Sequence, residues 1–133
     1  MFPLPMNLLL DSNTVVWFLE GASELSETAA ELIESLGSRS LVSSVTPWEL
    51  AIKTGLGKLR LPYSLGDEFD STLQSMGFEL LPLSQAALER TARLPGHHRD
   101  PFDRLLVAEA LEQSAALVSP NEILDDYGVT RIW

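Results

Sequence analysis

The chain has 133 residues, 45% of them hydrophobic, which predicts a single globular domain over residues 1–133 with a sizeable core. Its formal net charge of −10 argues against a general nucleic-acid coat protein, because such proteins need a basic face, but it leaves room for a local basic rim. The sequence contains no cysteine, which excludes a disulfide framework and a thiolate metal site and suits a cytoplasmic protein.

Membrane association and export are not expected. No apolar run approaches the ~20 residues of a membrane-spanning helix, and the first residues lack the basic segment that begins a secretory signal. Met6 lies just before the first apolar run, so residues 1–5 are expected to form a flexible N-terminal extension.

Taken in chain order, the apolar pattern predicts strands that alternate with helices. Strands are expected at residues 8–10, 41–45, 78–81 and 115–118, with an edge strand at 129–133. Helices are expected at 12–20, 26–36, 65–76, 84–94 and 120–127, and two more begin at Pro47 and Pro101. This alternation is typical of βαβ units, so it predicts an α/β fold with a central, mostly parallel sheet and helices on both faces.

Three predicted helix starts share one pattern, in which a capping residue is followed by proline and an acid lies three residues after the cap. The pattern occurs at residues 46–49, 100–103 and 119–122. Taken alone, each is a helix cap with a local role. Ser12 or Asn13 is expected to cap the first helix in the same way.

Polar residues also follow the predicted strands. Asp11 comes directly after the first strand, Glu49 follows the second, and acids and the amide near Asn121 follow the fourth. Because an open parallel sheet has its crevice at the carboxyl ends of its strands, these residues are expected to converge there, joined by Asp103. A receiver-like or phosphatase-like domain would need further acids beside Asp11 or a lysine at a late strand end, and the sequence has neither.

Carboxylates gathered in one crevice repel each other, and a bound divalent cation removes the conflict. With oxygen ligands and no sulfur, the expected ion is Mg²⁺, with Mn²⁺ as the alternative. Such an ion lowers the pKa of a bound water, so the reaction needs no side-chain nucleophile.

Five stretches carry an ordered set of motifs that spans nearly the whole chain. They are residues 8–11 (LLLD) with Trp17, 43–53 (SSVTPWELAIK), 57–59 (GKL), 94–106 (LPGHHRDPFDRLL), and 127–129 (YGV) with Ile132 and Trp133. Together they resemble the PIN domain family, and most of all its VapC-type toxins from bacterial type II toxin–antitoxin pairs. The resemblance implies a three-layer α/β/α fold with four to five strands and a Mg²⁺-dependent endoribonuclease that cleaves tRNA, rRNA or mRNA. It also implies a cognate VapB-like antitoxin and a homodimer.

The resemblance assigns roles to individual residues. Asp11, Glu49 and Asp103 match the three catalytic, metal-binding acids, and Asn121 falls at a fourth metal position that is usually Asp. The supporting positions around the ion are Asp100, Ser119 and Glu122, and Asp125 or Asp126 could also compensate for the missing charge. Because an amide adds no charge, the alternative is a PIN-fold binding module with an impaired metal site that acts through partner contact.

Basic residues are expected to hold the RNA. Those assigned to this role are Lys53, Lys58, His98, Arg99 and Arg104. The alternative for His98 is a solvated loop residue, and Arg104 could instead pair with an acid. Trp17, Phe18 and Trp48 are expected to be core residues, with a groove for the antitoxin as the alternative.

Overall fold

The computed structural model describes residues 6–133, so the predicted extension at residues 1–5 lies outside the described residues. The described chain forms a five-stranded sheet of order β3-β2-β1-β4-β5, in which every neighbouring pair is parallel. The strands are β1 (Met6–Leu10), β2 (Ser38–Ser43), β3 (Glu79–Leu81), β4 (Ala116–Val118) and β5 (Arg131–Ile132). The predicted parallel sheet is therefore confirmed, including its edge strand.

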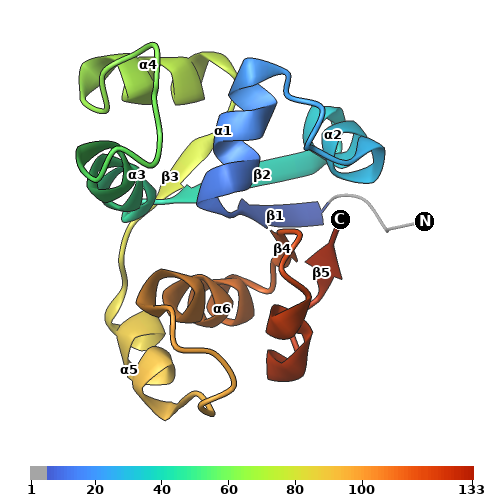
Figure 1. The fold of residues 1–133 in the computed structure, drawn as a ribbon. Coiled ribbons are helices and arrows are strands. Elements are labelled where there is room, and N and C mark those ends of the chain that lie inside the picture. Colours follow the sequence, from blue (N-terminus) through green and yellow to red (C-terminus); the bar gives the residue numbers. More distant parts are fainter. Residues whose placement is uncertain (1–5) are drawn as a thin grey trace.

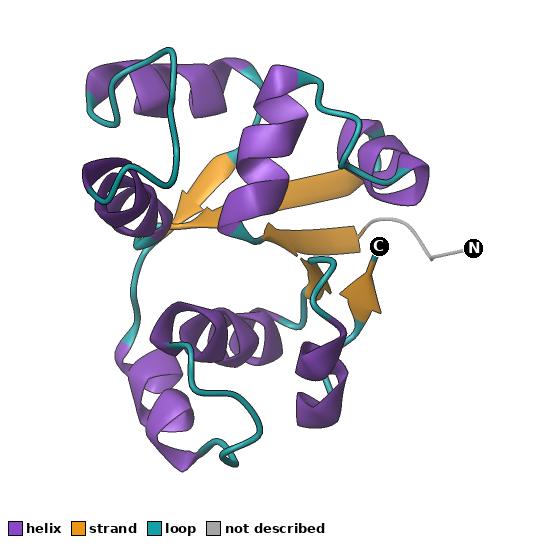
Figure 2. Cartoon of the chain, in the orientation of Figure 1, coloured by secondary structure: helices purple, strands orange, loops and turns teal. Residues whose placement is uncertain are grey.

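Helices cover both faces of this sheet. They are α1 (Ser12–Glu20), α2 (Glu27–Glu34), α3 (Thr46–Gly55), α4 (Asp67–Ser75), α5 (Gln85–Arg93), α6 (Pro101–Gln113) and the 3₁₀ helix η1 (Glu122–Tyr127). Figure 1 shows α1 to α4 on one side of the sheet and α5, α6 and the red η1 on the other, and Figure 2 shows the same three layers by element type. This confirms the α/β/α architecture. Along residues 6–133, no helix has the length and apolar character needed to cross a membrane.

The alternation of side chains along the central strand builds two apolar cores. Leu8 and Leu10 pack into the core beneath α1, α2 and α4, where Phe69 is also fully buried. Leu9 points to the opposite face and packs with Leu106 of α6. Because β1 is covered on both faces, its residues read as a continuous apolar run, as expected for a central parallel strand.

The strand order places a crevice at the end of β1. The chain moves outward from β1 to β2 and β3 on one side, then crosses to β4 and β5 on the other. In such sheets a ligand site lies outside the carboxyl ends of the strands where the order reverses. Here that point lies between β1 and β4, and the Asp11 N–H donates to the Val118 carbonyl at 3.2 Å.

The structure corrects the predicted cap of the first helix. Asp11, rather than Ser12 or Asn13, caps α1, because its Oδ1 accepts the Thr14 N–H at 2.8 Å. The short loop after β1 leaves Asp11 in extended backbone, and this is the conformation that a capping residue needs.

The predicted cap at Thr46 is also wrong. Thr46 is the first residue of α3 and is buried, and Val45 holds the cap position without a side-chain hydrogen bond. Likewise, Asn121 rather than Ser119 caps η1. In contrast, the predicted starts at Ser26, Ser84 and Asp100 are confirmed as caps.

The second helix ends earlier than its apolar pattern predicts. α2 stops at Glu34, two residues before the predicted end, and the apolar Leu36 lies fully exposed in the turn that precedes β2. The turn is fixed by the Ser35 side chain, whose hydroxyl accepts the Gly37 N–H at 3.3 Å. The apolar pattern therefore predicted the end of this helix two residues too late.

Candidate metal centre

Asp11 is held at the centre of the carboxyl edge by contacts to two elements. Its side chain caps α1, and its backbone is tied to the end of β4. The Thr14 hydroxyl donates to the Val118 carbonyl at 3.0 Å, which fixes the first turn of α1 against the same strand. The Asp11 side chain is consequently positioned by backbone geometry and is only 8% exposed.

Glu49 lies in the first turn of α3, and it is also only 8% exposed. The Lys53 Nζ lies 3.1 Å from Glu49 Oε2 and donates to the Ser12 hydroxyl at 3.4 Å, so Lys53 links α3 to α1. Burial raises the pKa of Glu49, the Lys53 ammonium and the Ser12 hydroxyl lower it, and the nearby charge of Asp103 raises it again.

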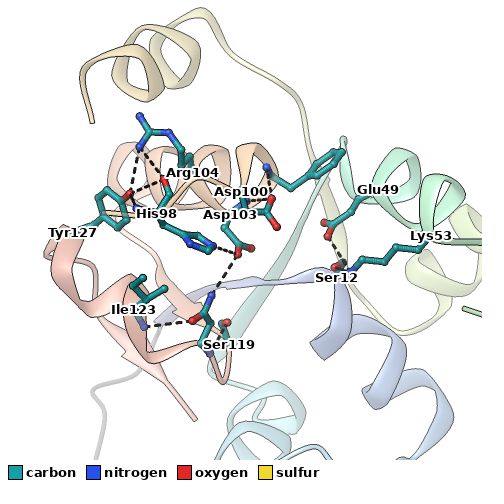
Figure 3. Close-up of polar contacts among 12 residues, drawn as sticks. Ser12, Glu49, Lys53, His98, Asp100, Asp103, Arg104, Ser119, Ile123 and Tyr127 are labelled. Carbon is teal, nitrogen blue, oxygen red and sulfur yellow. Dashed lines mark hydrogen bonds and ion pairs between the residues drawn. The ribbon is translucent and has the colours of Figure 1, made fainter. Parts of the chain in front are cut away.

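Asp103 lies in the first turn of α6, just after the Asp100 cap. Asp100 accepts the N–H of Phe102 at 2.9 Å, and this cap sets the direction in which Asp103 points. The Asp103 Oδ2 lies 2.8 Å from His98 Nε2 and accepts from the Asn121 amide at 3.4 Å. Figure 3 shows His98 and Asp103 in contact on one side of the site, with Glu49 and Lys53 facing them from the other.

The three acids act on one another electrostatically. Burial raises the pKa of Asp103, His98 lowers it, and the charges of Asp100 and Asp11 raise it further. The charge of Asp103 in turn raises the pKa of Glu49. Neighbouring carboxylates that disfavour the ionised forms of Asp103 and Glu49 leave surplus negative charge at the site, and a divalent cation with carboxylate ligands fits such a donor set.

The residues predicted to support the ion fall into two groups. Asp100, His98 and Asp103 each place a ligand atom within 4.8 Å of the others, and Asn121 contacts Asp103 directly. The buried Ser119 holds Asn121 in place, because its hydroxyl accepts the Asn121 N–H at 3.2 Å. Glu122 and Asp126, in contrast, are exposed on η1, and Asp125 forms an ion pair with Arg131 at 2.8 Å. These three acids are therefore poorly placed to replace a missing charge at Asn121.

The predicted RNA-binding residues also divide. Lys53 and His98 contact the acids themselves. Arg104 holds the end of α5 and the loop between α5 and α6 in place. Its guanidinium donates to the carbonyls of Thr91, Leu94, Pro95 and His98 and to the Tyr127 hydroxyl. Contact with RNA would require Arg104 to break these bonds. Lys58 and Arg99 line a groove beside Glu49.

Two residues of structural importance were not predicted from the sequence: Tyr127, which contacts the loop of the site, and the buried Glu109. The buried Tyr127 accepts the His98 N–H at 2.8 Å, so it fixes the loop from which His98 reaches Asp103. The only signal was its place in the 127–129 motif. Glu109 lies within the apolar stretch of α6 and is only 2% exposed, although a charged residue there is expected to face solvent.

The three aromatic residues near the site differ in burial. Phe18 is half-buried against Phe78, and Trp17 is half-buried with its ring centroid 5.8 Å from that of Trp133. The prediction that Trp48 is a core residue is wrong, because 62% of it is exposed. α3 turns Leu50 inward instead, and that places Trp48 on the outer face.

Comparisons with known proteins were made for both sequence and fold. The sequence matches the family model of the PIN domain over residues 8–129, and the comparison with curated proteins gives no match. The fold is similar to that of VapBC2 from Rickettsia felis bound to a DNA fragment from their promoter. The TM-score is 0.69 at 17% identity, covering 96% of this chain and 99% of that chain.

Two further structures show the same likeness. FitAcB from Neisseria gonorrhoeae gives a TM-score of 0.64 at 17% identity, covering 95% of this chain and 96% of that chain. The PIN domain endonuclease Utp24 gives 0.50 at 14% identity, covering 92% of this chain and 77% of that chain. The chain therefore belongs to the PIN domain family, and its fold is that of the VapC-type members to which the sequence motifs pointed.

Proposed function

We propose that the chain is a metal-dependent endoribonuclease toxin that cleaves RNA in the cytoplasm and is neutralised by a VapB-like antitoxin. The observation that carries the proposal is the placement of Asp11, Glu49 and Asp103, which are buried or half-buried at the switch point of the sheet, where the charge of Asp11 raises the pKa of Asp103 and the charge of Asp103 raises the pKa of Glu49. The nuclease activity of PIN domains such as the Utp24 endonuclease supports it.

Asp11, Glu49 and Asp103 would hold Mg²⁺ or Mn²⁺, with Asn121 at the fourth position. When bound, such an ion supplies an activated water and stabilises the charge that develops on the phosphate. The chain's own residues prepare the site. His98 and the Asn121 amide fix one Asp103 oxygen, and Lys53 offsets the buried charge of Glu49. The test is cleavage of a labelled single-stranded RNA, which we expect with Mg²⁺ and not with EDTA.

The partner proposal rests on the structural likeness to VapBC2 and FitAcB, the first of which is bound to promoter DNA. We propose that the antitoxin covers this site and that the nuclease is a homodimer. Expression of the chain with the neighbouring gene of its operon, followed by sedimentation analysis, measures both the partner and the stoichiometry.

A specific observation favours the second candidate, a PIN-fold binding module with an impaired metal site. The Asn121 amide donates a hydrogen bond to the Asp103 carboxylate, so a neutral group partly satisfies this carboxylate. An acid at position 121 could not donate this bond, and the Asp103 carboxylate would then need a cation. The amide also brings no negative charge of its own to the ion.

The Asn121→Asp variant tests whether the amide at this position weakens the metal site, the premise of the second candidate. A carboxylate at this position cannot donate to Asp103 and repels it, so we expect a lower melting temperature without metal. We also expect Mn²⁺ to bind more tightly, by about tenfold, the lower end of the 10–100-fold range for changes around a metal site. Calorimetric titration with Mn²⁺ measures the affinity, and Glu122→Gln, which changes an exposed neighbour, is the control. Equal Mn²⁺ affinity in Asn121→Asp and the parent would place Asn121 outside the site.

A further inference from the structure

The outer face of α3 carries an exposed apolar strip. Trp48 and Ile52 lie one helical turn apart, Leu56 caps the C-terminal end of the helix, and the exposed fractions are 62% for Trp48, 39% for Ile52 and 64% for Leu56. Exposing a tryptophan and two aliphatic side chains in a row is unfavourable in water. Contiguous apolar surface of this kind marks a binding surface in a folded protein.

The aromatic end of this strip adjoins the proposed catalytic acids. Trp48 directly precedes Glu49, and Phe102 directly precedes Asp103. The rings of Trp48 and Phe102 pack edge to face, with their centroids 5.3 Å apart and an interplanar angle of 69°. The aromatic pair therefore joins the first turns of α3 and α6, the two helices that carry these acids.

Next to this pair is a groove of about 440 Å³. Ile52, Leu56 and Phe102 contribute apolar lining to this groove, and Lys58 and Arg99 contribute positive charge. Glu49, which pairs with Lys53, and Asp100, which caps α6, line it as well. Within residues 6–133, neither Lys58 nor Arg99 takes part in an ion pair. In a chain with a net charge of −10, two such cations beside an apolar surface suit a ligand that is flat, apolar and anionic at once.

We infer that Trp48 and Phe102 form a stacking platform for the unpaired base next to the scissile phosphate. Lys58 and Arg99 bind the phosphates that flank this base. Sequence-tolerant binding of single strands uses this combination of aromatic faces and a basic groove, because every base has a stacking face. The inference rests on the proposed nuclease function, and a paired base, which is already stacked within its helix, cannot use this platform.

The test compares Trp48→Ala with Trp48→Tyr, which keeps an aromatic face, in the full-length chain. Leu36→Ala is the matched control, because Leu36 is an exposed apolar residue in the turn that precedes β2. The substrates are one labelled RNA as a single strand, as a duplex, and with one abasic position on either side of the cleaved bond. The readouts are KM and kcat with Mg²⁺, and RNA affinity by fluorescence anisotropy in EDTA.

For Trp48→Ala we expect the single-strand KM and dissociation constant to rise by about 5- to 150-fold, the range for losing one stacked base. We expect kcat to change little, because stacking stabilises the ground and transition states alike. Trp48→Tyr should recover most of the affinity, and Leu36→Ala should behave as the parent. One abasic position should weaken binding to the parent and have no further effect on Trp48→Ala.

Three results would overturn the inference, and one of them would overturn the proposed nuclease function as well. If the parent neither binds nor cleaves any RNA, the proposed function fails together with the inference. If the parent cleaves RNA while Trp48→Ala keeps its KM and the abasic position has no effect, only the stacking platform fails. If Trp48→Ala keeps its RNA affinity but no longer binds the antitoxin, the strip is a protein-docking surface instead.

Discussion

Neutralising any one of the three acids is expected to abolish RNA cleavage while leaving the fold intact. For Asp11→Asn, Glu49→Gln and Asp103→Asn we expect cleavage rates to fall on the order of 100-fold or more, the size of loss when one electrostatic stabiliser of a transition state is removed. Mn²⁺ binding should weaken in parallel, because each variant removes a charged oxygen ligand. Single-turnover cleavage and calorimetric titration measure the two effects.

The same variants should not lose stability, and this separates a functional role from a structural one. Burial raises the pKa values of Glu49 and Asp103, so ionising them costs free energy in the metal-free fold. In Asp11→Asn the amide oxygen can still accept the Thr14 N–H, and Asn is as good a cap as Asp. Asp126→Asn, on the exposed surface of η1, is the control for cleavage. A neutral variant that melts well below the parent but cleaves normally would mean that its acid is structural.

The second large effect is expected at Glu109, where removing a charge should stabilise the protein. Glu109 is only 2% exposed, and within residues 6–133 neither carboxylate oxygen has a hydrogen-bond partner. Burial raises its pKa to about 6, and the Ser43 hydroxyl, close by but outside hydrogen-bonding geometry, offsets this only in part. The difference between this value and the ordinary 4.5 corresponds to ~2 kcal/mol.

The pH dependence follows from the direction of this shift. Below pH 4.5, Glu109 is protonated in both the folded and the unfolded chain, so its contribution is neutral. Between 4.5 and about 6 the unfolded chain releases the proton while the fold retains it, so stability falls as the pH rises. Above this range the full cost remains, and Glu109→Gln and Glu109→Leu should each unfold with a higher free energy than the parent at pH 7.5.

Urea unfolding at pH 7.5 and pH 4.5 tests this expectation. The advantage of Glu109→Gln should be on the order of 2 kcal/mol at the higher pH and vanish near the lower one, because Gln removes the charge and keeps the shape. Glu109→Leu should stay more stable at both, since it also removes an unpartnered polar group. Equal stability of the parent and Glu109→Gln at both pH values would contradict this expectation. It would mean that ionising Glu109 costs the folded protein no free energy.

Much of the fold was predictable because its signals are local. The apolar run before Asp11 indicated the central strand, and the pair Asp100-Pro101 indicated the start of α6, each from adjacent residues. The placement of acids after strand ends followed from the parallel topology. The start of α3 was predicted within one residue, at Pro47, but its cap was not, because Val45 makes no side-chain hydrogen bond and leaves no signal of its own.

What could not be predicted depends on tertiary contacts. α3 has apolar residues on both faces, so its periodicity could not decide whether Leu50 or Trp48 faces inward. Arg104 is a cation by sequence, but its five hydrogen-bond acceptors come from the last turn of α5, from the loop that follows it, and from Tyr127. Glu109 is buried because α6 packs against β1 and β4 of the sheet, which no local pattern around residue 109 reveals.

The central claim is that the acids at the switch point form a metal-dependent nuclease, and cleavage by the purified chain tests it most directly. A single-stranded RNA is incubated with the parent and with Asp103→Asn, first in EDTA and then with a series of Mg²⁺ or Mn²⁺ concentrations. We predict no cleavage in EDTA, saturable cleavage by the parent as either ion is added, and on the order of 100-fold less by Asp103→Asn at every concentration. Cleavage by the parent that persists in EDTA, or that Asp103→Asn matches at all ion concentrations, would contradict the account.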